Sequence, residues 1–138
     1  MNNQPATTIT SVDDVVDFCA DDPTGCSSIH LDHDGAFTCG TRATVLDSLE
    51  AWATDPSRIV QAASTIDTCG RRWIIFVRQD TPPTENDASH HLDISAALAC
   101  EGVDLIDTVI AWGDQHISMH QLKHRSASYA QADWHNAA

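Results

Sequence analysis

Apolar residues along the chain fall into runs whose spacing separates strands from helices. The run Trp73 to Val77 is too short for a buried helix and is rich in β-branched and aromatic side chains, which predicts a central strand. Val103 to Trp112 predicts a second apolar strand. Gly113-Asp114 then predicts a turn, after which we expect Gln115 to Met119 to pair back along the same strand.

An earlier hairpin is predicted by alternating polar and apolar residues. Ser28 to Asp32 alternates as a half-buried strand does, and His33-Asp34-Gly35 has the composition of a tight turn, with glycine supplying the positive φ. Ala36 to Leu46 returns as the partner strand. We expect that strand to be interrupted near Gly40.

Three segments carry the start signals of helices. Ser11 to Cys19 has a serine cap, early carboxylates and apolar residues at helical spacing. Asp55-Pro56 predicts a second helix that ends at Gly70, because Asp caps well and Pro fits the first helical position. Thr84 with Asp87 resembles a capping box, and the third helix that it opens should end at Gly102.

The order of these segments predicts one α/β domain, a single mixed β-sheet flanked by helices in the order α-β-β-α-β-α-β-β. The chain has 138 residues, of which 42% are hydrophobic, and this is enough for one core. We expect residues 1–10 to be a flexible N-terminus, residues 11–122 to form the domain, and residues 123–138 to be a polar tail in which only Trp134 docks.

The charge balance argues against several classes of partner. The formal net charge is −13, and the chain holds a single lysine, Lys123. Nucleic acid is not expected as a partner, because phosphate binding needs a Lys/Arg surface. The basic cluster Arg71, Arg72 and Arg78 is expected to balance nearby carboxylates. No apolar run has the length of a membrane span and the first ten residues lack signal-peptide features, so we expect a cytoplasmic protein.

The cysteines predict reduced, mostly buried thiols. They are odd in number and far apart, with no C-x-x-C pair, which fits neither a disulfide framework nor a zinc ribbon. They are Cys19, Cys26, Cys39, Cys69 and Cys100.

The strand Ile74 to Val77 and the helix start after it resemble a metal-hydrolase motif. In the RadC-like branch of the JAB/MPN metalloprotease family this segment reads strand, His-x-His-Pro-Ser-Gly-Asp, then Pro-Ser-x-x-Asp. Here Asp80, the Pro83-Thr84 helix start and Asp87 match without a gap. The resemblance runs from about residue 29 to 122. It also includes Leu31-Asp32 with its turn, Gly40-Thr41, Pro56 to Val60, Gly102 to Ile110, and Gly113-Asp114.

The resemblance implies a cytidine-deaminase-like fold and a zinc site held by two His and one Asp. In this chain Ile74 and Phe76 occupy the two His positions, and only Asp87 keeps its type. Catalytic zinc needs three protein ligands and an open position for water, and Ile74 and Phe76 offer no lone pair. The family's general base falls near Thr41 or Arg42, neither of which is a carboxylate. No catalytic residue is therefore assigned.

A relocated metal site is the alternative. Asp87 and His91 are four residues apart on one predicted helix face and His90 is beside them, so these three residues are candidate ligands. The other interpretation is that both His are partly exposed helix residues and that Asp87 supports the helix start. The remaining histidines are not expected to form a site. His30 and Asp32 face one side of a strand, and His33 in the turn is expected to be solvated. The helical spacing of His116, His120 and His124 is expected to be a coincidence.

Two classes of function follow. The first is a non-catalytic, RadC-like JAB domain without a cofactor that acts as a protein-binding or scaffold module, with a protein partner or a second copy as its ligand. Trp52 and Trp134 are candidate contacts, although core burial is expected for each. The second is a divergent zinc-dependent peptidase or isopeptidase with the relocated site. A third, a DNA-repair accessory, is disfavoured by the charge.

Overall fold

A computed structural model describes residues 9–21, 25–32, 38–46, 49–55, 57–58 and 72–124, with the backbone alone for 32, 38–46 and 124. Its elements are α1 (Val12–Phe18), β1 (Gly25–Asp32), β2 (Thr38–Leu46), α2 (Leu49–Ala53), β3 (Arg72–Arg78), α4 (Glu85–Cys100), β4 (Asp104–Trp112), β5 (Gln115–Ser118) and α5 (Met119–His124).

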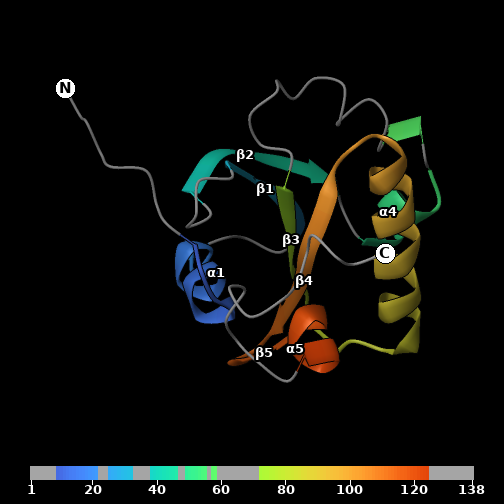
Figure 1. Ribbon diagram of the computed structural model, residues 1–138. Helices are drawn as coiled ribbons and strands as arrows, with labels where there is room; N and C mark the ends of the chain where they lie inside the picture. Colours follow the sequence, from blue (N-terminus) through green and yellow to red (C-terminus); the bar gives the residue numbers. More distant parts are fainter. Residues whose placement is uncertain are drawn as a thin grey trace.

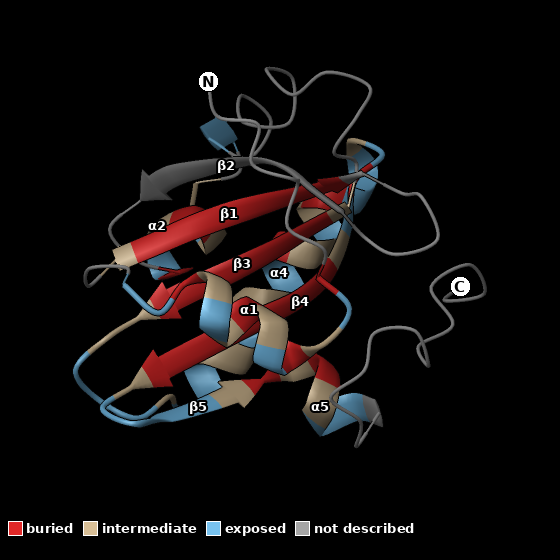
Figure 2. Ribbon diagram, turned by 90° about the vertical axis from the view of Figure 1, so that its left-hand side faces the viewer, coloured by how far each residue is buried: buried red, intermediate tan, exposed pale blue. Residues whose placement is uncertain are grey.

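The strands form one mixed sheet with the order β2-β1-β3-β4-β5 (Figure 1). The pair β3–β4 is parallel, and the pairs β1–β2, β1–β3 and β4–β5 are antiparallel. Helix α1 lies on one face and α4 on the other, as both ribbon views show (Figures 1 and 2). The predicted class, a mixed β-sheet flanked by helices, is therefore confirmed.

Strand β3 is buried on both faces, as its unbroken apolar sequence predicted. Ile74 and Phe76 pack on the α1 face, while Trp73, Ile75 and Val77 pack on the face that α2 and α4 cover. A strand in the middle of a sheet that has helices on both faces exposes no side chains to solvent. Its sequence therefore does not alternate between apolar and polar residues.

Local signals placed several boundaries correctly. Ser11 caps α1, with its side chain accepting a hydrogen bond from the Asp14 amide. Gly102, at φ +77, follows the end of α4 as a C′ glycine should. Gly113, at φ +58, turns β4 into β5. The expected interruption near Gly40 is a bulge, because His30 pairs with Thr41 and Leu31 with Cys39, which leaves one extra residue on β2.

Two helices were not predicted, α2 and α5. Helix α5 shortens the last strand, which was expected to reach Met119 but ends at Ser118. The reason is that the Ser118 hydroxyl accepts a hydrogen bond from the Gln121 amide at 3.1 Å, as a helix cap does. Because α5 extends to His124, residues 123 and 124 are helical where the tail was expected to begin.

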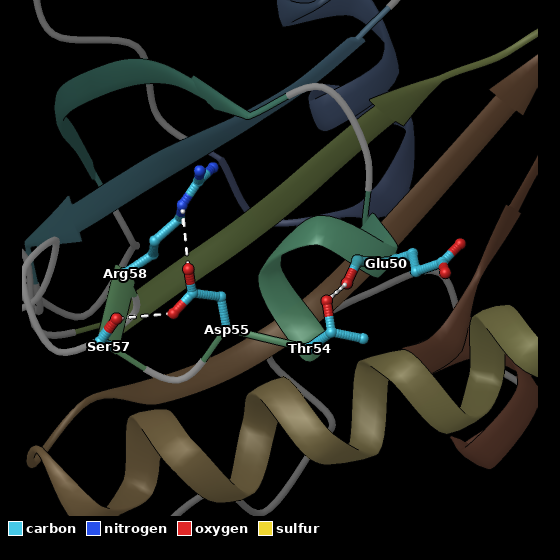
Figure 3. A network of polar contacts seen from close by, with 5 residues as sticks. All are labelled: Glu50, Thr54, Asp55, Ser57 and Arg58. Atoms are coloured by element: carbon cyan, nitrogen blue, oxygen red, sulfur yellow. Dashed lines mark hydrogen bonds and ion pairs between the residues drawn. The ribbon is translucent and has the colours of Figure 1, made fainter.

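The helix predicted to begin at Asp55-Pro56 is described only at its start. The Asp55 carboxylate accepts a hydrogen bond from the Ser57 hydroxyl at 2.6 Å and pairs with Arg58 Nε at 3.2 Å (Figure 3). The hydrogen bond from Ser57, followed by the charge of Arg58, lowers the pKa of Asp55. Ser57 and Arg58 are helical. The rest of that helix, the turn at residues 33–35 and the tail with Trp134 lie outside the described residues.

None of the described helices is long and apolar enough to cross a bilayer.

Candidate functional site

The two positions that the resemblance assigns to metal-binding His are part of the core. Ile74 is 0% exposed and Phe76 is 1% exposed. Both belong to the apolar cluster between the sheet and α1, together with Val12, Val15 and Ile29. Hydrocarbon side chains have no donor atom for zinc, and helix α1 packs against both of them. The residues present at these positions therefore do not fit a metal.

Asp87 stabilises the start of α4. Its Oδ2 accepts a hydrogen bond from the Thr84 amide at 2.8 Å, and Thr84 Oγ1 accepts one from the Asn86 amide at 3.3 Å. This is the capping box that the sequence predicted. Helix α4 packs Ile94 and Leu98 against the face of the sheet opposite to the Ile74 and Phe76 side chains. Asp87 therefore has a structural role that requires no metal.

His91 points inward and is held neutral. Its Nδ1 lies 2.6 Å from the Thr108 hydroxyl on β4, so the ring ties α4 to the sheet. Burial, and secondarily the charge of Lys123, lower the pKa of His91 to about 4. A neutral ring with one nitrogen hydrogen-bonded can in principle use the other as a ligand.

His90 is half-buried, and its Nδ1 has no hydrogen-bond partner. Within the ranges that the structure describes, no three His, Cys, Asp or Glu side chains are grouped so that they could hold a metal ion. The candidate ligands Asp87, His90 and His91 are thus not brought together. Asp87 faces Thr84 and His91 faces Thr108.

A buried polar cluster on β4, β5 and α5 was missed. Asp107 is 0% exposed, and its Oδ2 accepts a hydrogen bond from the Ser118 hydroxyl at 2.5 Å. Its Oδ1 accepts one from the His120 amide at 2.9 Å. Asp107 is the register partner of Ile74 on the neighbouring strand. A signal was available, because Asp107-Thr108 interrupts an otherwise apolar strand.

The Asp107 cluster has the residue types of a hydrolytic triad but not the arrangement. The Ser118 hydroxyl donates to the carboxylate, and His120 contributes its main-chain amide to the same carboxylate. Asp107 and Ser118 are 0% exposed and His120 is 3% exposed, so a substrate cannot reach them. The arrangement can instead anchor α5, because a carboxylate at a helix N-terminus satisfies amides that have no partner within the helix.

His30 is a core residue on β1. Its Nε2 lies 2.8 Å from the Ser28 hydroxyl, and its ring stacks on Trp73 with the centroids 4.4 Å apart. Trp52 meets Trp73 edge-on at 6.0 Å. Trp52 is 1% exposed, so it belongs to the core and is not a surface contact. Burial lowers the pKa of His30 to about 4.

His30 should make the fold sensitive to acid. Its pKa falls from 6.5 in the unfolded chain to about 4 in the folded one. Across that window the unfolded chain binds more protons, so stability rises with pH and is lost on acidification. At about 1.4 kcal/mol per pKa unit, the loss between pH 7 and pH 4 is on the order of 3 kcal/mol.

Urea unfolding across this pH range measures the effect. The double variant Ser28→Ala/His30→Phe keeps the stacking on Trp73 and should remove the part of the pH dependence that His30 contributes, while the part that comes from His91 remains. His116→Gln, at an exposed position on β5, is the matched control and should keep the wild-type slope. Equal slopes for all three proteins would mean that His30 does not carry the acid sensitivity.

The described arginines serve local structure. Arg72 Nη1 lies 3.9 Å from an Asp104 carboxylate oxygen. Arg78 Nη2 donates to the Cys19 carbonyl at the end of α1, with the guanidinium 5.4 Å from the centre of the Phe76 ring. This agrees with the expectation of charge balance for Arg72, while Arg78 caps a helix. The Arg71 side chain lies outside the described residues.

No family model matches the chain, and no curated protein matches it.

Proposed function

We propose that this chain is a non-catalytic JAB/MPN-like domain of the RadC-like type that acts as a protein-binding or scaffold module. The observation that carries the proposal is the burial of Ile74 and Phe76 in one apolar cluster with α1. With core residues at the two ligand positions, the strand cannot bind a metal, and the buried side chains stabilise the fold instead. The sequence motif around Asp80, Pro83 and Asp87 supports this assignment, and a mixed sheet flanked by helices is compatible with it.

A cytoplasmic location is part of the same proposal. Neither Cys26 nor Cys100 forms a disulfide; Cys26 is buried and Cys100 is exposed. Burial raises the pKa of Cys26 to about 12, so this thiol stays protonated and unreactive at neutral pH. Cysteines without a disulfide are typical of proteins in a reducing compartment, because disulfides form and persist in oxidising ones.

Metal analysis of the purified protein tests the proposal. Wild-type protein refolded with zinc and then desalted should carry far less than one zinc per chain. The variant Asp87→Ala/His91→Ala should show the same small response to zinc in thermal unfolding as the wild type, although its melting temperature is lower without zinc. One bound zinc per chain, lost in this double variant, would instead establish the relocated peptidase site at Asp87, His90 and His91.

A further inference from the structure

One face of helix α4 packs on the sheet and α2, and three apolar residues, one leucine and two alanines, lie on the opposite side. Ile94 and Leu98 are 0% exposed and pack on the sheet, whereas Leu92 is 66% exposed on the outer side. Ala96 and Ala99 are exposed as well, and their spacing of four and then three residues places them in line with Leu92. A surface helix usually has a polar outer face, and Leu92 is one of two large apolar side chains that stay exposed among the described residues.

The outer apolar face, defined as Leu92, Ala96 and Ala99, is open to a partner. In Figure 1 helix α4 forms one side of the molecule, with the sheet on its other side. His91 is turned inward to Thr108 and does not take part in this face. The two alanines in line with Leu92 let the backbone of a second helix approach closely, because their small side chains do not hold the two helices apart.

The charges around this face select the kind of partner. Glu85 and Asp93 are exposed on α4, and Glu101 follows as its C-cap. The sixteen residues of α4 include no Lys or Arg. Two copies of α4 packed together would place carboxylates opposite carboxylates, on chains that each carry a net charge of −13. A second copy is therefore a poor occupant, whereas Lys and Arg side chains complement this border.

We propose that the outer apolar face of α4 binds a cationic amphipathic helix of another protein. Leu92 packs into the apolar stripe of that helix, Ala96 and Ala99 allow its close approach, and its Lys or Arg residues pair with Glu85 and Asp93. This inference rests on the proposed function, because it specifies the surface and the class of partner that a binding module would use.

Fluorescence anisotropy with two synthetic helical peptides tests this proposal on the full chain. Both peptides span about three heptads, with Leu and Ala along one stripe. One carries Lys beside the stripe and the other carries Glu. The Lys peptide should bind at least about tenfold more tightly than the Glu peptide, and more weakly as salt is raised.

Two leucine variants locate the binding face. Leu92→Ser should weaken binding of the Lys peptide about tenfold, because Leu92 is the large apolar contact of the face. Leu122→Ser is the matched control, since Leu122 is 60% exposed on α5, and it should bind as the wild type does. Both substitutions are at exposed positions, so circular dichroism and melting temperature should stay close to wild type.

Three results would overturn the proposal. They are equal binding of the two peptides, no effect of Leu92→Ser, or a dimer in sedimentation velocity that Leu92→Ser dissociates, which would make a second copy the occupant. The failures of the two proposals can be told apart. One zinc per chain would refute the non-catalytic function but would leave peptide binding at the Leu92 face unchanged. Equal binding of the two peptides by a zinc-free protein would refute only the proposed binding face.

Discussion

Replacing Asp107 with Ala should lower the free energy of unfolding by about 3–5 kcal/mol. The substitution leaves the Ser118 hydroxyl and the His120 amide buried without their acceptor, and each unsatisfied group costs about 1–3 kcal/mol. A domain of this size is stable by only about 5–15 kcal/mol, so the variant should be close to its unfolding limit. Urea unfolding at pH 7, followed by circular dichroism, measures the difference.

Two further variants separate the roles of the Asp107 carboxylate. Asp107→Asn keeps one acceptor oxygen and the side-chain volume, so its loss of stability should fall between those of wild type and Asp107→Ala. Ser118→Ala removes one bond to the carboxylate and the cap of α5, with an expected cost of about 1–2 kcal/mol. A loss below about 1 kcal/mol for Asp107→Ala would show that the carboxylate does not anchor α5.

Placing histidines at the two positions that the resemblance assigns to metal ligands, as Ile74→His/Phe76→His, should unfold or severely destabilise the protein without creating a zinc site. The change removes two fully buried apolar side chains and places polar rings in the cluster with α1. We expect a loss of at least about 4 kcal/mol, from the lost burial and the cost of unpaired polar groups. Urea unfolding gives the stability, and zinc content per chain gives the metal occupancy.

The matched control is Ile74→Val/Phe76→Leu, which keeps both positions apolar and should cost less than about 1.5 kcal/mol per site. If the histidine variant instead binds one zinc per chain and stays as stable as this control, the cluster with α1 is no barrier to metal. In that case the side chains of Ile74 and Phe76, and not the packing of α1, would keep a metal from these positions.

Much of the backbone could be predicted because its signals are local. The capping box at Thr84 and the glycine at 102 fix the start and the end of α4 by hydrogen bonds and backbone angles within a few residues. The run Trp73 to Val77 could only be a strand covered on both faces. Helix α2 was missed although Asp47-Ser48 precede it and Glu50 lies in its first turn, because its five residues are too few to show a helical repeat of apolar positions.

The candidate site was less predictable, since the chemistry of a side chain depends on what lies around it. Asp87 and His91 share a helix face in the sequence, yet one satisfies the Thr84 amide and the other the Thr108 hydroxyl. His30 was taken for an ordinary strand histidine, and only its burial against Trp73 keeps it neutral. Sequence spacing shows that two residues share a helix face, but it does not show which group each side chain contacts.

By itself the sequence determined the mixed α/β class, most strand and helix positions, and the absence of ligand atoms at Ile74 and Phe76. These depend on residue type and on contacts within a few residues. Only the tertiary structure decided that helix α1 closes over those two side chains, that Asp107 anchors α5, and that Leu92 stays exposed while Ile94 and Leu98 are buried. The reason is physical, because burial and hydrogen-bond partners come from segments far apart in the chain, and no local pattern specifies which segments will meet.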